Sequence, residues 1–158
     1  MQKTFRTKKQ TREIFERKGH TMDSYKHIVQ YYETDKMGIT HHSNYIRWME
    51  EARCDFLKKI GWDYARFEEQ GIVSPVVDIA GKYKATTTFE DEIFIDVSVQ
   101  EFKSAKMILH YDMRKGDGTK VFEGTSSHCF LNEKGMPMRM NKAFPEFHQT
   151  LLQYKAEE

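Results

Sequence analysis

The stretch Asn44-Tyr-Ile-Arg-Trp-Met-Glu-Glu-Ala-Arg-Cys-Asp-Phe-Leu-Lys-Lys-Ile60 decides the fold, because it holds the strongest periodic signal in the chain. Its apolar residues recur at steps of three, four and one, so they lie on one face of a helix about four turns long. They are Tyr45, Trp48, Met49, Ala52, Phe56, Leu57 and Ile60. Ser43 or Asn44 can serve as the N-cap, and Gly61 supplies the left-handed residue that ends the helix. We therefore expect one long helix with one buried face.

Runs rich in β-forming residues lie on both sides of this helix. The run before it, residues 25–33, ends at the polar, Gly-containing stretch 34–43. After it, further strands are predicted at residues 72–88, 93–102, 105–114 and 120–132. Short helices are expected at residues 62–70 and 142–154, and Lys115-Gly-Asp-Gly118 is typical of a tight hairpin because Gly tolerates positive φ.

This order of elements predicts the architecture. A single sheet buries one long helix only if it curls around that helix, so we expect an α+β fold in which a curved antiparallel sheet of about five strands wraps a central helix. The edges of such a sheet expose unpaired N–H and C=O groups, which pair readily with another chain. A homodimer or tetramer is therefore expected, with each active site completed by the partner chain.

Charge and composition exclude several classes of protein. The 158 residues carry 25 Lys and Arg against 24 Asp and Glu, and a formal charge of +1 predicts no nucleic-acid partner. No apolar run reaches the roughly 18–20 residues of a membrane span, and no secretory signal precedes the body, so a cytoplasmic protein is expected. Cys54 and Cys129 form no CxxC pair, which favours reduced thiols over a disulfide or a zinc site.

The charge is concentrated at the N-terminus. Residues 1–21 hold seven Lys or Arg against two Glu and have few large apolar side chains, so we expect a basic, poorly ordered arm ahead of a single domain at residues 22–158. The composition favours a solvated extension over a nucleic-acid-binding tail. Met22 is also a possible alternative start, and the sequence leaves that question open.

The motif Tyr32-Glu-Thr-Asp35-Lys-Met-Gly38-Ile-Thr-His-His42-Ser-Asn44-Tyr45-Ile-Arg-Trp48-Met-Glu-Glu-Ala-Arg53 closely resembles the signature of the 4-hydroxybenzoyl-CoA thioesterase family of hot-dog proteins. The shared pattern is an Asp, a Gly three residues on, an Asn-Tyr pair and then an aromatic, acidic helix. The resemblance implies a hot-dog fold, hydrolysis of an acyl thioester, and no cofactor, because coenzyme A is part of the substrate. It also implies that Asp35 is the catalytic carboxylate.

The residues themselves are compatible with this chemistry. Thioester hydrolysis needs a base or nucleophile on one side of the carbonyl and a donor for the developing oxyanion on the other. Asp35 lies nine residues before Asn44, on a loop that leads into a helix N-terminus, so a carboxylate and free N–H groups can face the same small volume. Gly38 lets this loop turn sharply. The alternative is that Asp35 only caps a turn.

The neighbouring polar residues have less defined roles. His42 falls where several family members carry a residue near the thioester, so a role in positioning substrate is expected, with a solvent-facing residue as the alternative. Asn44 can hold the loop or touch substrate. Adjacent histidines rarely point at one ion and no HExxH motif accompanies them, so no metal is expected. Of Glu50 and Glu51, one is expected to pair with Arg47 or Arg53 on the exposed side of the helix.

The function predicted from these observations is hydrolysis of an acyl-CoA or acyl-carrier-protein thioester by Asp35, without metal. The alternative is a non-catalytic module that binds or senses acyl thioesters. A dehydratase is less favoured, because His110, His128 and His148 lack the contexts of hot-dog dehydratases. Acyl chain length and the choice between nucleophile and general base stay open.

Overall fold

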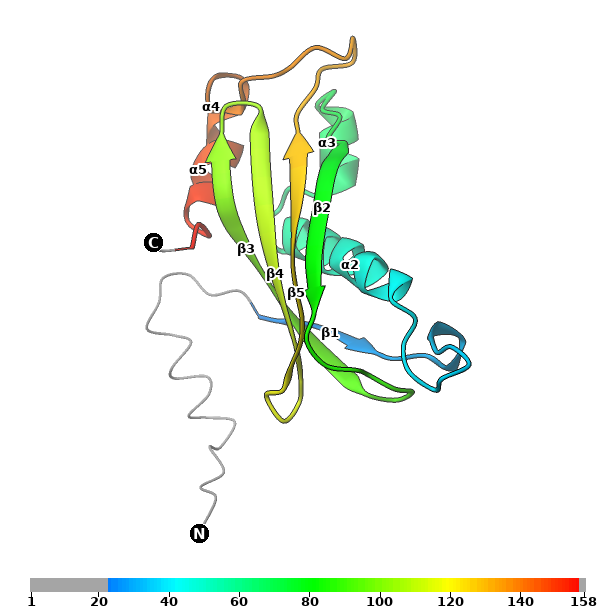
Figure 1. Ribbon diagram of the computed structural model, residues 1–158. Coiled ribbons are helices and arrows are strands. Elements are labelled where there is room, and N and C mark those ends of the chain that lie inside the picture. Colours follow the sequence, from blue (N-terminus) through cyan, green and yellow to red (C-terminus); the bar gives the residue numbers. More distant parts are fainter. Residues whose placement is uncertain (1–22, 157–158) are drawn as a thin grey trace.

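The structure is a computed structural model that describes residues 23–156, and these residues form a five-stranded antiparallel sheet with a long helix lying across one face (Figure 1). The strands are β1 (Tyr25–Ile28), β2 (Val76–Tyr83), β3 (Glu92–Lys103), β4 (Lys106–Lys115) and β5 (Lys120–Cys129), in spatial order β1-β3-β4-β5-β2. The helices are η1 (Tyr31–Glu33), α2 (Ser43–Lys59), α3 (Tyr64–Glu69), α4 (Met140–Ala143) and α5 (Pro145–Leu152). The predicted α+β architecture is thus confirmed. The predicted arm at residues 1–21 lies outside the described residues.

Helix α2 buries the face that the periodicity predicted. Six of the seven predicted apolar residues are buried against the sheet, and Ile60 is half-buried at the helix end. Gly61 follows with φ +82°, as expected for the residue that ends a helix. The predicted N-cap is wrong, because the cap position is His42 and no side chain caps the helix there. Ser43 and Asn44 direct their polar groups to His41 and the preceding loop instead.

Several predicted strands are shorter or shifted in the structure. Strand β1 stops at Ile28, because Glu33 turns back and accepts a hydrogen bond from the Gln30 N–H, which starts the 3-10 turn η1. Strand β2 begins only at Val76, one residue after Pro75, which has no N–H to donate to a ladder. At the C-terminus, the predicted single helix is two, because Phe144 leaves helical geometry and Pro145 starts a new helix.

Strand β2 forms an edge of the sheet whose eight residues are all exposed. Its neighbour β5 places the ring of Phe122 over two glycines, one on each strand. A Cβ at Gly81 meets that ring at 2.3 Å, and a Cβ at Gly124 meets it at 2.7 Å, so neither position has room for a side chain. The Phe122 ring in turn stacks on Tyr45 of α2, with centroids 5.2 Å apart. Tyr83 of β2 also packs directly on Tyr45, with centroids 5.2 Å apart, so the edge strand contacts the start of the long helix through two aromatic rings.

Candidate active site

Residues 33–41 form a short hairpin directly before α2. The His41 N–H closes its base by donating to the Glu33 carbonyl at 2.8 Å. Nearer the tip, the Asp35 N–H donates to the Ile39 carbonyl, also at 2.8 Å. Asp35 therefore sits in a defined hairpin that leads straight into a helix N-terminus, as the sequence predicted.

The two carboxylate oxygens of Asp35 have different surroundings. Oδ1 accepts a hydrogen bond from the Met37 N–H at 2.8 Å, so Asp35 does cap a turn. Among residues 23–156, Oδ2 has no hydrogen-bond partner, and it is not among the buried unpaired oxygens of that part of the chain. Asp35 itself is half-buried. One oxygen thus holds the loop while the other is available to a ligand or a water molecule.

Gly38 supplies the turn that the sequence analysis predicted. Its φ is +79°, and a Cβ placed there meets no atom within 4 Å, so the glycine is needed for backbone conformation and not for space. Its N–H donates to the Asp35 carbonyl at 2.9 Å, and its own carbonyl accepts from the Thr88 hydroxyl at 2.9 Å. The tip of the hairpin is therefore fixed to the segment between β2 and β3.

Asn44 and His42 occupy distinct positions beside the hairpin. Asn44 is buried, and its Nδ2 donates to the carbonyls of Glu33 and His41 at 3.0 and 3.2 Å, so it holds the loop. His42 is exposed, and its carbonyl accepts from the Tyr83 hydroxyl at 2.9 Å. Its ring lies 4.1 Å from that of His41. The His42 side chain is thus free to meet a ligand, whereas Asn44 is occupied within the protein.

The first N–H groups of α2 already have acceptors in this single chain. The Ser43 N–H donates to His41 Nδ1 at 3.3 Å, and the Asn44 N–H donates to the His41 carbonyl at 3.0 Å. These two groups are therefore not available to an oxyanion while His41 keeps this position.

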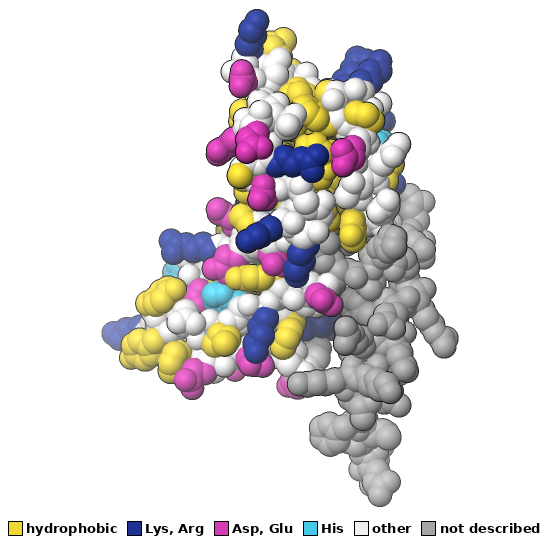
Figure 2. All heavy atoms as spheres, turned by 180° about the vertical axis from the view of Figure 1, so that it is seen from behind, with side chains coloured by type: hydrophobic (Ala, Val, Ile, Leu, Met, Phe, Trp, Pro, Cys, Tyr) yellow, Lys and Arg dark blue, Asp and Glu magenta, His cyan; other side chains and the backbone are white. Residues whose placement is uncertain are grey.

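An exposed apolar surface surrounds the hairpin. Tyr31 and Tyr32 are 76% and 80% exposed, Met37 is 76% exposed, and Phe89 packs edge-on against Tyr31 with centroids 5.6 Å apart. Figure 2 shows a group of hydrophobic side chains at the protruding lower left end of the molecule, where η1 and the hairpin lie. Exposed aromatic groups of this size beside the Asp35 carboxylate mark a surface for a ligand or a partner chain.

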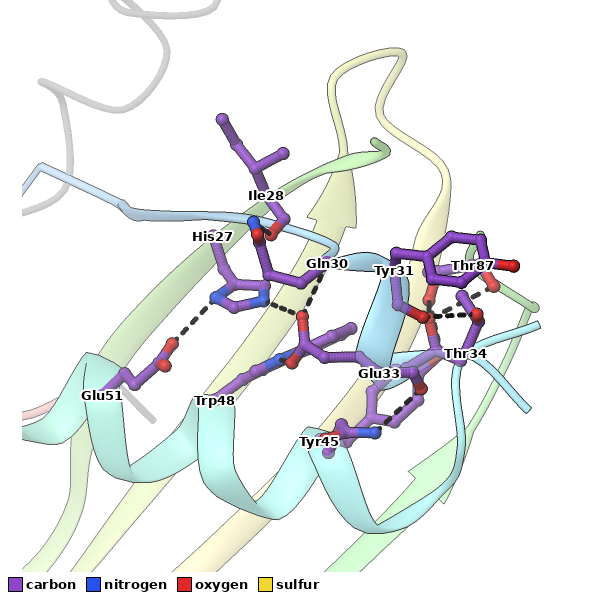
Figure 3. Close-up of polar contacts among 12 residues, drawn as sticks. His27, Ile28, Gln30, Tyr31, Glu33, Thr34, Tyr45, Trp48, Glu51 and Thr87 are labelled. Atoms are coloured by element: carbon purple, nitrogen blue, oxygen red, sulfur yellow. Dashed lines mark hydrogen bonds and ion pairs between the residues drawn. The ribbon is translucent and has the colours of Figure 1, made fainter. Parts of the chain in front are cut away.

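Glu33 is the residue that the sequence analysis missed. It is only 4% exposed, and it lies two positions before Asp35. Its Oε1 accepts from the Gln30 N–H at 2.8 Å and lies 2.7 Å from His27 Nε2, while Oε2 accepts from Trp48 Nε1–H at 2.6 Å (Figure 3). Burial opposes ionisation of this carboxyl, but these hydrogen bonds outweigh it and lower its pKa. Glu33 is thus held as a buried carboxylate. The sequence does hold one indication of such a buried acceptor. Trp48 lies on the buried face of the predicted helix, and a buried indole N–H needs a hydrogen-bond acceptor.

The expected pairing on the outer side of α2 is wrong. Glu51 does not pair with an arginine, because its Oε2 lies 2.9 Å from His27 Nδ1 on β1. Arg53 is buried, and its guanidinium donates to the hydroxyls of Tyr64 and Tyr111 at 3.0 and 3.3 Å. Both side chains thus bond across elements and not along the helix surface.

Two further properties concern ligands and membranes. Within residues 23–156, no group of three or more His, Cys, Asp or Glu lies close enough to hold a metal ion. In the same part of the chain, no helix is long and apolar enough to cross a bilayer.

Comparison with known proteins defines the class that this fold and hairpin represent. Residues 29–152 match the thioesterase-like superfamily, so the chain belongs to that family. It is a hydrolase of the hot-dog acyl-CoA thioesterase family, and the predicted resemblance is confirmed.

Particular relatives support this membership. A Bacillus subtilis protein named "Putative acyl-CoA thioesterase YneP" is 36% identical over 76% of this chain and 88% of its own. The crystal structure of a DHNA-CoA thioesterase from Staphylococcus aureus superposes with a TM-score of 0.76 at 30% identity, covering 81% of this chain and 87% of the other. The structure of the gentisyl-coenzyme A thioesterase BH1999 has a TM-score of 0.69 at 28% identity, covering 77% and 98%.

Proposed function

We propose that this enzyme hydrolyses acyl-CoA thioesters with Asp35 as its catalytic carboxylate. The observation that carries the proposal is the Asp35 side chain, whose Oδ1 is fixed by the Met37 N–H while Oδ2 has no partner within residues 23–156. A fixed carboxylate with one free oxygen is oriented for attack or proton removal without further ordering. The relatives that are named for CoA thioesters favour coenzyme A over a carrier protein.

The free oxygen supports two routes with the same products. As a nucleophile, Oδ2 adds to the thioester carbonyl carbon, the C–S bond breaks, coenzyme A leaves as the thiolate, and water then cleaves the acyl anhydride. As a general base, Oδ2 takes a proton from a water molecule whose oxygen adds to the carbonyl carbon, after which the C–S bond breaks and the thiolate is protonated. In both routes, the exposed His42 ring is available to position the thioester, while Gly38 and Asn44 keep the loop in place.

A second copy of the chain completes the site in this proposal. Strand β2 is an edge strand with exposed Val76, Val77 and Ile79, and its free backbone groups can pair with the same strand of another molecule. Because the first N–H groups of α2 are already bonded to His41, a partner chain is also a suitable source of the oxyanion donor.

The test replaces Asp35 with Asn. The amide oxygen still accepts from the Met37 N–H, so the loop survives while the charge is lost. Hydrolysis of an acyl-CoA panel that includes gentisyl-CoA is followed by release of free thiol. We expect kcat to fall roughly 10²–10⁴-fold with a much smaller change in KM.

Asp117→Asn is the matched control, because Asp117 Oδ1 caps its own turn, between β4 and β5, by accepting from the Thr119 N–H at 2.9 Å. This control should retain wild-type kcat. An Asp35→Asn enzyme with more than about a tenth of wild-type kcat would make the hairpin a binding element and favour the non-catalytic sensing module.

A further inference from the structure

The His27 ring lies between two carboxylates that come from different elements (Figure 3). Its Nε2 is 2.7 Å from Glu33 Oε1 of η1, and its Nδ1 is 2.9 Å from Glu51 Oε2 of α2. Tyr25 on the same strand donates its hydroxyl to the same Glu51 oxygen at 3.3 Å, and Ile93, the β3 register partner of His27, brings no charge. Both ring nitrogens thus face carboxylate oxygens, so the ring is placed to bond Glu33 and Glu51 at once.

The main chain of Glu33 connects this buried cluster to the candidate catalytic residue. Its carbonyl accepts from the His41 N–H at 2.8 Å and from Asn44 Nδ2 at 3.0 Å. Glu33 thus closes the base of the hairpin that carries Asp35, while its side chain is held by Trp48 of α2 and by His27. A shift of Glu33 therefore displaces both ends of the hairpin.

We propose that Glu33 is a positioning residue for Asp35, and that the His27 ring keeps it in place by bonding Glu33 and Glu51 at once. The proposal rests on the catalytic role of Asp35 proposed above. A substitution that removes the charge of Glu33 or Glu51, or the His27 ring itself, breaks this bridge between the elements. The base of the hairpin then loosens. The rate of the chemical step falls while substrate binding changes little, because this cluster lies beneath the hairpin.

The first test compares two substitutions at equally buried hydrogen-bonded sites. Glu33→Gln keeps the size of the side chain, removes its charge and sets an amide NH₂ against an N–H donor. We expect kcat to fall roughly 10–100-fold with KM within about threefold of wild type. Ser126→Ala is the control, since it removes the buried bonds of Ser126 to Tyr111 and His128, at 2.7 Å each, away from the hairpin. It should lower stability and leave kcat unchanged.

A milder substitution guards against loss of folding. Should Glu33→Gln fail to fold, Glu51→Gln removes only the outer carboxylate, whose side chain is 42% exposed. This variant should lower kcat several-fold, again with little change in KM. A wild-type kcat in folded Glu51→Gln would overturn the role of His27.

A spectroscopic measurement separates positioning from general destabilisation. The chain has two tryptophans, so the ¹⁵N-labelled protein gives two indole N–H signals. The Trp48 signal reports its bond to Glu33, whereas Trp62 packs among aromatic rings and serves as the internal reference. We expect the Trp48 signal to shift in Glu51→Gln and in His27→Gln, the variants in which kcat falls, while the Trp62 signal stays in place.

The outcomes distinguish this inference from the proposed function. Inactive Asp35→Asn together with a wild-type kcat in Glu33→Gln overturns the positioning role alone. Active Asp35→Asn overturns both proposals. A wild-type kcat and an unshifted Trp48 signal in folded His27→Gln overturn the role of His27.

Discussion

Asp35 uses its two carboxylate oxygens for different purposes. Oδ1 binds the Met37 N–H and fixes the turn, and Oδ2 stays available. Turn capping and catalysis, which are alternatives on spacing alone, are therefore compatible in one side chain. A capped carboxylate also loses little conformational freedom on meeting its substrate, which is an advantage for a group that acts at one carbonyl carbon.

Gly38 gives a prediction at the scale of one residue. Because its φ is +79° and a Cβ added there would meet no atom within 4 Å, Gly38→Ala introduces backbone strain of about 1–2 kcal/mol without a clash. We expect lower stability in urea unfolding and a lower kcat, since the strained turn lies three residues after Asp35. Gly38→Asn should recover much of both, because Asn tolerates this conformation.

Gly118→Ala is the control for Gly38→Ala. Its φ is +90° and its surroundings are equally open, but it lies in the hairpin between β4 and β5. It should lose similar stability and keep kcat. Equal losses of kcat in both alanine variants would contradict a local role for Gly38.

At the site, the sequence predicted what is close in the chain. Asp35 and Gly38 share one hairpin, and Asn44 bonds the base of that hairpin from the first turn of α2, so all three lie within ten residues of sequence. The contacts of Glu33 with His27 and Trp48 span six and fifteen residues and depend on how β1 meets α2. No pattern of neighbouring residues predicts how β1 packs on α2. The apolar spacing indicated only that Trp48 belongs to the core.

At the scale of elements, a buried polar chain connects α2 to the sheet. Arg53 donates to the Tyr111 hydroxyl, which lies 2.7 Å from Ser126 Oγ, and Ser126 Oγ lies 2.7 Å from His128 Nε2. The Arg53 guanidinium donates at one end of this series. Each hydroxyl then accepts one hydrogen bond and donates one, provided that His128 Nε2 accepts at the other end. Burial, with the positive charge of Arg53, lowers the pKa of His128 to about 4. His128 is therefore neutral in the folded protein at neutral pH.

This series of buried hydrogen bonds predicts that the stability of the protein depends on pH. The pKa of His128 is lower in the folded protein than in the unfolded chain, so its contribution is present above pH 6.5 and is lost as the pH falls towards 4. The loss amounts to at most roughly 3 kcal/mol. Urea unfolding of wild type and His128→Gln from pH 7 to 4 measures it. The variant should be less stable at pH 7 and have a shallower dependence. Parallel curves for the two proteins would contradict this account.

Element boundaries departed from the sequence prediction where single contacts override propensity. The run 25–33 has strand composition throughout, yet the Glu33 carboxylate bonds the Gln30 N–H and converts its end into η1. In contrast, strand β3 follows the apolar alternation of its own sequence, with Ile93, Ile95 and Val99 buried and Val97 half-buried.

At the scale of the whole molecule, β2 is the edge at which a second copy is expected to pair. We predict that Val77→Lys, at a position 65% exposed, shifts the protein towards monomer in sedimentation velocity and lowers kcat. Leu152→Lys on α5, 42% exposed, is the matched control and should change neither. A wild-type protein that is monomeric and fully active at micromolar concentration would refute the shared site.

The close packing of the Phe122 ring on Gly81 and Gly124 has a consequence for how β2 and α2 can shift relative to each other. The Phe122 ring fills the space between the outer strand and Tyr45 at the first turn of the long helix, and Tyr83 of the same strand packs directly on Tyr45, with centroids 5.2 Å apart. Strand and helix end thus share a continuous aromatic contact. A change in the curvature of the outer strand, such as pairing with another chain would impose, is therefore expected to reposition the helix end that follows the Asp35 hairpin.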